Sequence, residues 1–380
     1  MMSWARQQLA NMAGTPEPIH GTAALHTVGA QTDSDPYTIL EKEHLEWADL
    51  DSTSVETQTF YLLADSGHVG IVQVIHSNIA GLRKTSQFNT KIFYPKSLSK
   101  SHLWSTDQLN DVGFSPDKLN FYANDCAVEI SEDGKHYTIK SITNENSFVN
   151  LKISQIAPGL QVGKDGKTLY GTDPMNPWGC VRHTFWPKNS VEGSIVTTDG
   201  PIDFKGRCLF VHALHGMKPH HAAAKWNFIN FQGPAISAFL MEYTTPKSYG
   251  TTVVSVGGLI QNDEILMANS LNSVVHTKVK LDEQNGWLIP ESIKVEWEGK
   301  SKNGEDIHAI LEGSLGERTD RIDVMAEVPG FVKQIVAGAA GTKPYIYQYC
   351  IESVSLRVKI GDASFTEKGH LFAEATFISA

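Results

Sequence analysis

The feature that most constrains this chain is a two-residue hydrophobic period that begins near residue 55 and recurs through the rest of the sequence. Residues that alternate in this way describe a strand with one buried face. The clearest sets are Val128 and Ile130; Val275, Thr277, Val279 and Leu281; Ile293, Val295 and Trp297; and Leu356, Val358 and Ile360.

Tight turn signals separate these runs. EDGK at 132–135, EQNG at 283–286 and KNGE at 302–305 each lie between two strand-like segments. Asx-Gly pairs supply the positive φ angles that hairpin turns require. Short strands joined by hairpins predict an all-β chain of antiparallel sheet, and barrel closure would pair the edges that so many strands expose.

A chain of 380 residues is too long for one typical core, so we expect two domains. The best boundary is GMKPHHAAAK at 216–225, which combines Gly, Pro and small residues between two strand-like runs. We therefore expect an N-terminal helix at 1–14, a connector at 15–54, and barrel domains at 55–217 and 218–380. FVKQIVAG at 331–338 has helical spacing and predicts a short helix or lid among the strands.

Composition narrows the functional class. A net charge of −10 argues against a general nucleic-acid binder, because phosphate binding needs a basic surface. The four cysteines form no CxxC pair, so we interpret them as buried thiols in a reducing compartment. The N-terminus lacks the continuous apolar stretch of a secretory signal, and no run reaches the length of a membrane-spanning helix, so we expect a cytoplasmic protein.

The first segment has a helical pattern. Met1, Trp4, Ala5, Leu9 and Met12 share one face, whereas Arg6, Gln7 and Asn11 fall away from it. A helix of about three turns is marginal alone in water and needs a surface to bind. The pattern favours a membrane interface and the protein's own barrel equally.

Four histidines cluster at His212, His215, His220 and His221. Dense imidazoles are able to hold a metal. However, His212 and His215 point to opposite faces of a strand, and no Cys or carboxylate lies at ligand spacing nearby. We therefore predict no metal site and no bound cofactor, and interpret these histidines as structural or ligand-lining.

Two aromatic segments are candidates for ligand binding. In PWGCVRHTFWPKN at 177–189, Arg182 and His183 lie among aromatics that include Trp178, and they could bind the polar end of an apolar ligand or lock a barrel corner. In KWNFINFQ at 225–232, Trp226 and Asn227 suit either a bound head group or an internal hydrogen-bond network.

Motifs of covalent catalysis are missing from the sequence. It contains no G-x-S-x-G elbow, no H-E-x-x-H and no G-x-x-x-x-G-K-[ST]. We therefore nominate no catalytic residue, although an enzyme that works by shape and hydrogen bonds would leave no such motif.

Several long stretches resemble the fungal survival factor family, the oxidative-stress survival proteins with tandem lipocalin-like domains. They run almost from end to end: EPIHG, SVETQTFYLL, VQVIHSNIAGL, PWGCVRHTFWPKN, HALHGMKPHHAAAKWNF, MEYTTPKSYG, VPGFVKQIVAG and KPYIYQY.

This resemblance implies two lipocalin-like barrels and a peripheral association with Golgi and endoplasmic reticulum membranes through the N-terminal helix. It also implies binding and non-vesicular transfer of ceramide between these membranes, in support of sphingolipid homeostasis and survival under oxidative stress. A nuclear pool is a further expectation. Only Arg6 adds positive charge to the helix, so attraction to anionic lipid should be weak.

Two functional hypotheses remain open. The first is a ceramide carrier, with Trp178, Arg182, His183, Trp226 and Asn227 as candidate lining residues. The second is a lipocalin-fold enzyme that acts on an apolar substrate, such as a cyclase or hydratase, by analogy at the level of fold. The sequence determines neither which barrel would hold the ligand nor the oligomeric state.

Overall fold

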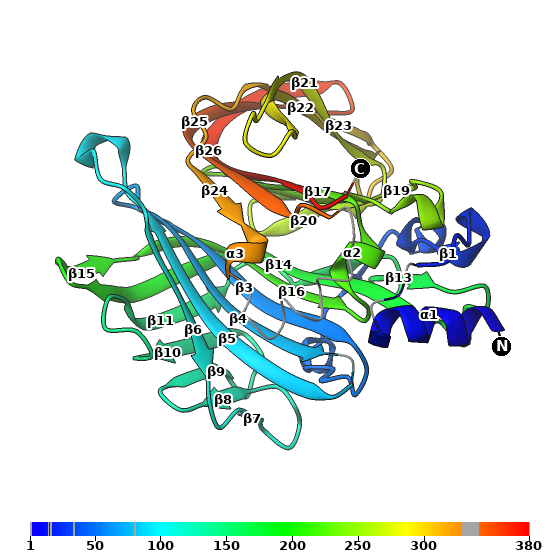
Figure 1. Ribbon diagram of the computed structural model, residues 1–380. Helices are drawn as coiled ribbons and strands as arrows, with labels where there is room; N and C mark the ends of the chain where they lie inside the picture. The colour runs from blue at the N-terminus through cyan, green and yellow to red at the C-terminus, as the bar shows by residue number, and fades with distance from the viewer. Residues whose placement is uncertain are drawn as a thin grey trace. The chain divides into compact units, whose positions relative to one another are not determined.

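The computed structural model describes residues 2–13, 15, 17–32, 35–79, 81–327 and 342–379, and the side chains of Met12, Ala13 and Glu327 are not among the described parts. Its strands form two antiparallel sheets, and the first segment is a helix, α1 (Met2–Ala13) (Figure 1). The predicted all-β fold class is therefore confirmed.

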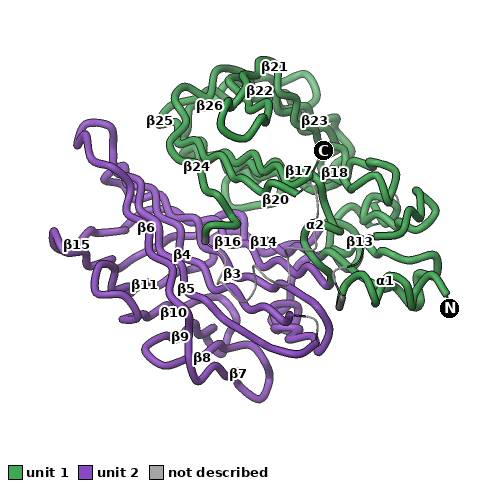
Figure 2. Tube along the Cα trace, in the orientation of Figure 1, with its two compact units in different colours: residues 1–38, 162–181, 217–380 green, residues 39–161, 182–216 purple. Residues whose placement is uncertain are grey.

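The chain divides into two compact units, neither of which is one continuous segment (Figure 2). Unit 1 comprises residues 1–38, 162–181 and 217–380, and unit 2 comprises residues 39–161 and 182–216. The sequence suggested a single division near residue 217. The structure instead assigns 162–181 to the same unit as the C-terminal part of the chain.

Unit 2 is built on one antiparallel sheet with the strand order β6-β5-β4-β3-β16-β14-β11-β10-β9-β8-β7. Its elements are η3 (Lys42–Leu45), β3 (Ser54–Ala64), β4 (Val69–Ile79), β5 (Arg83–Phe93), η4 (Lys96–Leu98), β6 (Leu103–Leu109), β7 (Gly113–Phe114), β8 (Phe121–Ala123), β9 (Cys126–Ile130), β10 (His136–Ser141), β11 (Phe148–Gln155), β14 (Gly179–Thr197), β15 (Gly200–Asp203) and β16 (Gly206–His215). The first three residues of β14 belong to unit 1.

Unit 1 carries the second sheet, with the order β20-β19-β18-β17-β26-β25-β23-β22-β21. Its elements after α1 are η1 (Thr22–Ala24), β1 (Leu25–His26), η2 (Val28–Gln31), β13 (Lys167–Tyr170), α2 (Pro219–Ala222), β17 (Lys225–Gln232), β18 (Ile236–Thr244), η5 (Lys247–Tyr249), β19 (Val253–Gln261), β20 (Glu264–Asn269), β21 (Asn272–Leu281), β22 (Leu288–Lys300), β23 (Asp306–Ser314), β24 (Asp320–Asp323), α3 (Val324–Glu327), β25 (Tyr345–Ile360) and β26 (Ala363–Phe377). Two short strands, β2 (Tyr37–Ile39) and β12 (Leu160–Val162), run across the sequence borders of the units.

The three predicted hairpins are present: β9 pairs with β10, β21 with β22, and β22 with β23, all antiparallel. Gly134, in the first turn, has φ 68°, a left-handed conformation that a residue with a Cβ adopts only with strain. The Asx-Gly pairs therefore predicted the positions of these turns correctly, and the positive φ angle of Gly134 is the physical reason.

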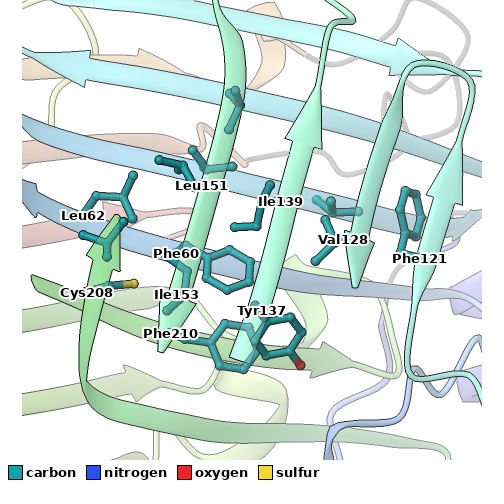
Figure 3. Packing of buried hydrophobic residues seen from close by; sticks show 14 of the residues in the cluster. Phe60, Leu62, Phe121, Val128, Tyr137, Ile139, Leu151, Ile153, Cys208 and Phe210 are labelled. Carbon is teal, nitrogen blue, oxygen red and sulfur yellow. The ribbon is translucent and has the colours of Figure 1, made fainter. Parts of the chain in front are cut away.

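Each unit has its own apolar core. Phe60, Tyr137 and Trp186 are among the residues at the centre of unit 2, where Figure 3 shows the first two packed together, and Leu240 and Trp297 are at the centre of unit 1, all at most 1% exposed. The inward faces of β9, β22 and β25 supply the predicted residues Val128, Val295 and Val358 to these cores, at 0–1% exposure. Alternation along the strands therefore predicted both cores correctly at these positions.

The same inference is wrong for β21. Val275, Val279 and Leu281 are 50%, 42% and 56% exposed, and Thr277 is exposed too. The reason is positional: β21 ends the strand order, and its register with β22 shifts twice between His276 and Val279. The period of two identified a strand there but not a buried face.

Three other expectations differ from the structure or lie outside it. The connector expected at 15–54 contains η1, η2 and η3 and two short strands. Cys126 and Cys208 are buried thiols as expected, but Cys180 and Cys350 are only half-buried, because neither belongs to one of the two apolar cores; none of these four described residues forms a disulfide. The proposed lid at 331–338 lies outside the described residues.

Within the described part of the chain, no helix combines the length and the apolar character needed to cross a membrane.

Candidate functional site

The N-terminal helix contacts unit 1 through its polar side. Gln7 and Ala10 are 0% exposed and Asn11 is 3% exposed, and α1 lies beside β13 and α2 (Figure 1). Gln7 and Asn11 are two of the three residues that the sequence pattern assigned away from the apolar face, whereas the third, Arg6, is exposed. The helix therefore binds its own protein through an amide-rich surface.

Hydrogen bonds hold this polar side in place. The Gln7 amide nitrogen donates to Glu17 Oε1 at 3.1 Å, and His20 Nε2 donates to Gln7 Oε1 at 3.1 Å. His221 Nδ1, on α2, donates to Asn11 Oδ1 at 3.1 Å. Burial raises the pKa of Glu17 to about 7 and lowers the pKa of His221 to about 3, so this docking surface is largely uncharged below neutral pH.

The apolar side of α1 faces away from the unit. Met2, Trp4 and Leu9 are 80%, 47% and 56% exposed, and Ala5 is exposed. Met1 and the Met12 side chain, the other two predicted members, lie outside the described parts. Fully burying one large apolar side chain stabilises by about 1.5–3 kcal/mol, so this surface has a strong tendency to bind another apolar surface.

Three of the predicted lining residues come from the segment 177–189. Trp178 lies in unit 1, where its Nε1 donates to Tyr249 Oη at 2.9 Å and its ring packs on His20. Arg182 and His183 lie in unit 2 on opposite faces of β14. Arg182 donates to the His44 carbonyl at 2.6 Å, and His183 packs edge-on against His215. The structure thus directs Arg182 and His183 to different surroundings.

The other two lining residues lie on opposite faces of β17 in unit 1. The Trp226 ring packs on Tyr243, with centroids 4.5 Å apart. Asn227 faces inward and bridges two strands: it donates to Glu242 Oε1 at 3.2 Å and accepts from His276 Nε2 at 2.8 Å. The internal hydrogen-bond network that the sequence left as one alternative is therefore present.

The four clustered histidines are also divided, between two elements of the fold. His212 and His215 do lie on opposite faces of β16, as predicted, and His220 and His221 lie in the short helix α2. The described residues include one group whose metal-ligating atoms converge within 4.8 Å, Glu296, Glu298 and His308, on β22 and β23. Lys294 forms an ion pair with Glu296 there, at 2.9 Å.

An irregular segment before β3 is fastened to the inward face of unit 2. The Glu56 carboxylate, 2% exposed, accepts the amide hydrogens of Ala48 at 2.8 Å and Asp49 at 3.0 Å. It also accepts from His212 Nε2 at 2.9 Å. These bonds hold Trp47, 1% exposed, against the core.

Sequence reasoning missed Glu56 and its neighbour Gln58 as interior residues. In SVETQTFYLL they occupy the same alternate positions as Phe60 and Leu62, which are core residues. Polar residues at core positions of a strand were the available signal, because a buried polar group needs a hydrogen-bond partner.

Known proteins match the sequence of this chain along almost its whole length. The model of the Svf1 family matches residues 2–379. The chain is 56% identical to the ceramide-binding protein svf-1 of Neurospora crassa and 51% identical to the ceramide-binding protein svf1 of Aspergillus fumigatus, in each case covering 100% of both proteins. The ceramide-binding protein svf1 of Schizosaccharomyces pombe is 39% identical, again over 100% of both.

Solved structures share the fold at low identity. CghA in complex with Sch210972 aligns with a TM-score of 0.57 and 11% identity, covering 94% of this chain and 98% of that one. Kievitone hydratase from Nectria haematococca aligns with a TM-score of 0.52 and 9% identity, covering 95% and 99%. These likenesses support the lipocalin-like fold alone. The full-length sequence relationship is the stronger one, and on it the chain belongs to the Svf1 family.

Proposed function

We propose that this protein binds ceramide and carries it between membranes, and that it contacts those membranes through the outward face of α1. Full-length identity of 56% to a relative named a ceramide-binding protein supports the ligand. The orientation of α1 supports the membrane contact and carries that part of the proposal. A helix that turns its amides toward the protein and Trp4 and Leu9 toward solvent is built to bind an apolar surface elsewhere.

The membranes we propose are those of the Golgi and the endoplasmic reticulum, and the role is transfer that sustains sphingolipid synthesis and survival under oxidative stress. Two buried carboxylates also favour a binding role over catalysis. The buried carboxylates Glu56 and Glu242 both accept hydrogen bonds from protein donors, so each has a structural use in the fold.

The ligand is tested by organic extraction and mass spectrometry of the purified protein, followed by a transfer assay between donor and acceptor vesicles. We expect ceramide in the extract and faster ceramide transfer with the protein than without it. Recovery of no lipid, together with unassisted transfer, would contradict the carrier function.

The membrane contact is tested by flotation with liposomes. We expect Trp4→Asp to lower membrane binding about tenfold or more, because the side chain no longer contributes the ~1.5–3 kcal/mol of apolar burial. Met175→Asp is the matched control, since Met175 is an exposed apolar residue, at 85%, that lies outside α1. Equal flotation of wild type and Trp4→Asp would exclude α1 as the anchor.

Lipid charge separates apolar from electrostatic binding in the same assay. Because Arg6 is the single charged residue of α1 and the chain carries a net charge of −10, phosphatidylcholine vesicles with and without phosphatidylserine should bind the protein alike.

A further inference from the structure

A buried carboxylate lies beneath the docked side of α1. The Glu17 side chain is 10% exposed and contacts residues of α1, α2 and η5, all within unit 1. Gln7 donates to Glu17 Oε1 at 3.1 Å, and Ser248 donates to Glu17 Oε2 at 2.7 Å. The hydroxyl of Tyr249 is a third hydrogen-bond partner. Glu17 therefore connects the helix to the rest of unit 1 through both of its carboxylate oxygens.

The basic groups nearest to Glu17 are histidines that burial keeps neutral. His221 Nδ1, on α2, lies 3.9 Å from Glu17 Oε1, but burial, followed by the charges of His220 and Lys218, lowers the pKa of His221 to about 3. Burial also lowers the pKa of His220 to about 4 and lowers the pKa of His20. Lys218 acts on the two histidines of α2, whereas the pKa of Glu17 depends on burial and on neutral donors.

The other elements around this carboxylate also present neutral groups. The docked side of α1 presents amides such as that of Gln7, and Arg6, the single charged residue of the helix, is exposed. η5 and β13 contribute the phenols of Tyr249 and Tyr170, and burial raises the pKa of both. In the described part of unit 1, an ionised carboxylate at this position therefore has hydrogen-bond donors but no cation beside it.

Burial without a cation favours the protonated form of Glu17. Burial raises the pKa of Glu17 to about 7, and the donors Ser248, Tyr249 and Gln7 oppose this shift without reversing it. A protonated carboxyl group is neutral and is easily accommodated under the helix, whereas an unpaired buried charge is costly. Undocking α1 admits water to the carboxylate and removes this cost. Ionisation of Glu17 therefore favours the undocked helix.

We propose that α1 is a pH-sensitive switch, which is docked on unit 1 while Glu17 is protonated and is released as Glu17 ionises. The docked helix presents Trp4 and Leu9 on a surface that the protein holds in place. A released helix of 12 residues is marginal in water, so its apolar face loses this fixed geometry. The switch thus links the pH of the surroundings to the way in which the apolar face of α1 is presented, whatever ligand the protein carries.

The test is amide hydrogen exchange of residues 2–13 in the full chain from pH 5.5 to pH 7.5, with each rate corrected for the intrinsic exchange rate at that pH. A carboxyl group whose pKa is raised by docking stabilises the docked state fully below its ordinary pKa, and this contribution is lost as pH rises through the docked value. Protection of α1 should therefore fall about tenfold or more over this range and stay level at higher pH.

Three variants identify the group that is responsible. Glu17→Gln keeps a neutral side chain of the same shape, so protection of α1 should no longer depend on pH. Ser248→Ala removes a donor that favours the ionised form, so the fall in protection should extend to higher pH than in wild type. Glu242→Gln is the matched control, because burial also raises the pKa of this carboxyl group in unit 1, where its partners are Asn227 and Val274. It should respond to pH as wild type does.

Several results would overturn the switch. Equal protection of α1 at pH 5.5 and pH 7.5 in wild type is one, and an undiminished fall in Glu17→Gln is another. If Glu17→Gln does not fold, Ser248→Ala decides, and an unchanged pH range in that variant contradicts the role of Glu17. A parallel loss of protection in β25 would mean unfolding of the whole unit rather than release of α1. None of these measurements involves ceramide or vesicles, so the proposed function is tested separately.

Discussion

At the scale of the residue, two buried glutamates show how local donors decide ionisation. Burial acts to raise the pKa of Glu56, but the hydrogen bond and charge of His212 and the amides of Ala48 and Asp49 hold it below its ordinary value. Burial also raises the pKa of Glu242, and there the Val274 amide and Asn227 do not reverse the shift. The charge of His212 and the number of donors therefore decide which carboxylate stabilises the fold in its charged form.

We predict opposite pH dependences for these two positions. A carboxylate with a lowered pKa contributes stability above its unfolded pKa and loses it as pH falls through the folded value. Glu56→Gln should therefore destabilise by about 3–5 kcal/mol at pH 7, as for a broken buried ion pair, and by clearly less near pH 4. Urea denaturation at a series of pH values measures both.

Glu242→Gln is the comparison for that series. Because burial raises the folded-state pKa of Glu242, the folded state loses stability as pH rises from the unfolded-state pKa toward the folded-state pKa. The stability of Glu242→Gln relative to wild type should therefore increase over this range.

A constant difference between Glu56→Gln and wild type from pH 4 to pH 7 would contradict the assignment of the Glu56 charge.

At the scale of the element, α1 shows what helical periodicity can and cannot determine. The pattern of Trp4, Ala5 and Leu9 defined an apolar face, and the helix at Met2–Ala13 agrees closely with the expected 1–14. Periodicity did not reveal which face would dock, because either face could be satisfied by a suitable partner. The partners Glu17, His20 and His221 are supplied by the fold, and only His221 is far away in sequence.

We predict that Gln7 controls how firmly α1 is held. Gln7→Ala removes its bonds to Glu17 and His20, worth about 0.5–1.5 kcal/mol each, so amide hydrogen exchange in residues 2–13 should accelerate about tenfold or more. The melting temperature of the whole protein should change little. Arg6→Ala, at an exposed position of the same helix, is the control and should leave exchange near the wild-type rate.

The same variant also gives a prediction for membrane binding. A helix released from unit 1 keeps its apolar face, so Gln7→Ala should still float with liposomes where Trp4→Asp does not. Unchanged exchange in Gln7→Ala would show that the polar contacts do not hold α1.

At the scale of the whole molecule, unit 1 is assembled from three separate segments. Residues 162–181 contribute Tyr170, which donates to the Ala222 carbonyl, and Trp178, which donates to Tyr249. Residues 1–38 contribute His20 and Gly21, whose amides both donate to the Ser248 carbonyl. A unit defined by such contacts does not coincide with a half of the sequence.

We therefore predict that residues 218–380 expressed alone lack a stable native fold. In the full chain, Tyr249 and the carbonyls of Ser248 and Ala222 accept hydrogen bonds from the other two segments. The fragment lacks these donors, so the three acceptors lose their partners. Amide NMR dispersion and thermal melting of the fragment, compared with the full chain, measure this. A fragment that is well dispersed and melts at the full-chain temperature would show that the other two segments are dispensable.

The sequence by itself determined the fold class, the three hairpins and the inward residues of β9, β22 and β25, because these depend on the two-residue period and on the φ preference of Asx-Gly turns, which are local properties. It could not determine the exposure of β21, the contribution of 162–181 to unit 1 or the docking face of α1. Each of these depends at least in part on partners that are distant in sequence, and only the tertiary structure decides which surface covers a strand and which face of a helix docks.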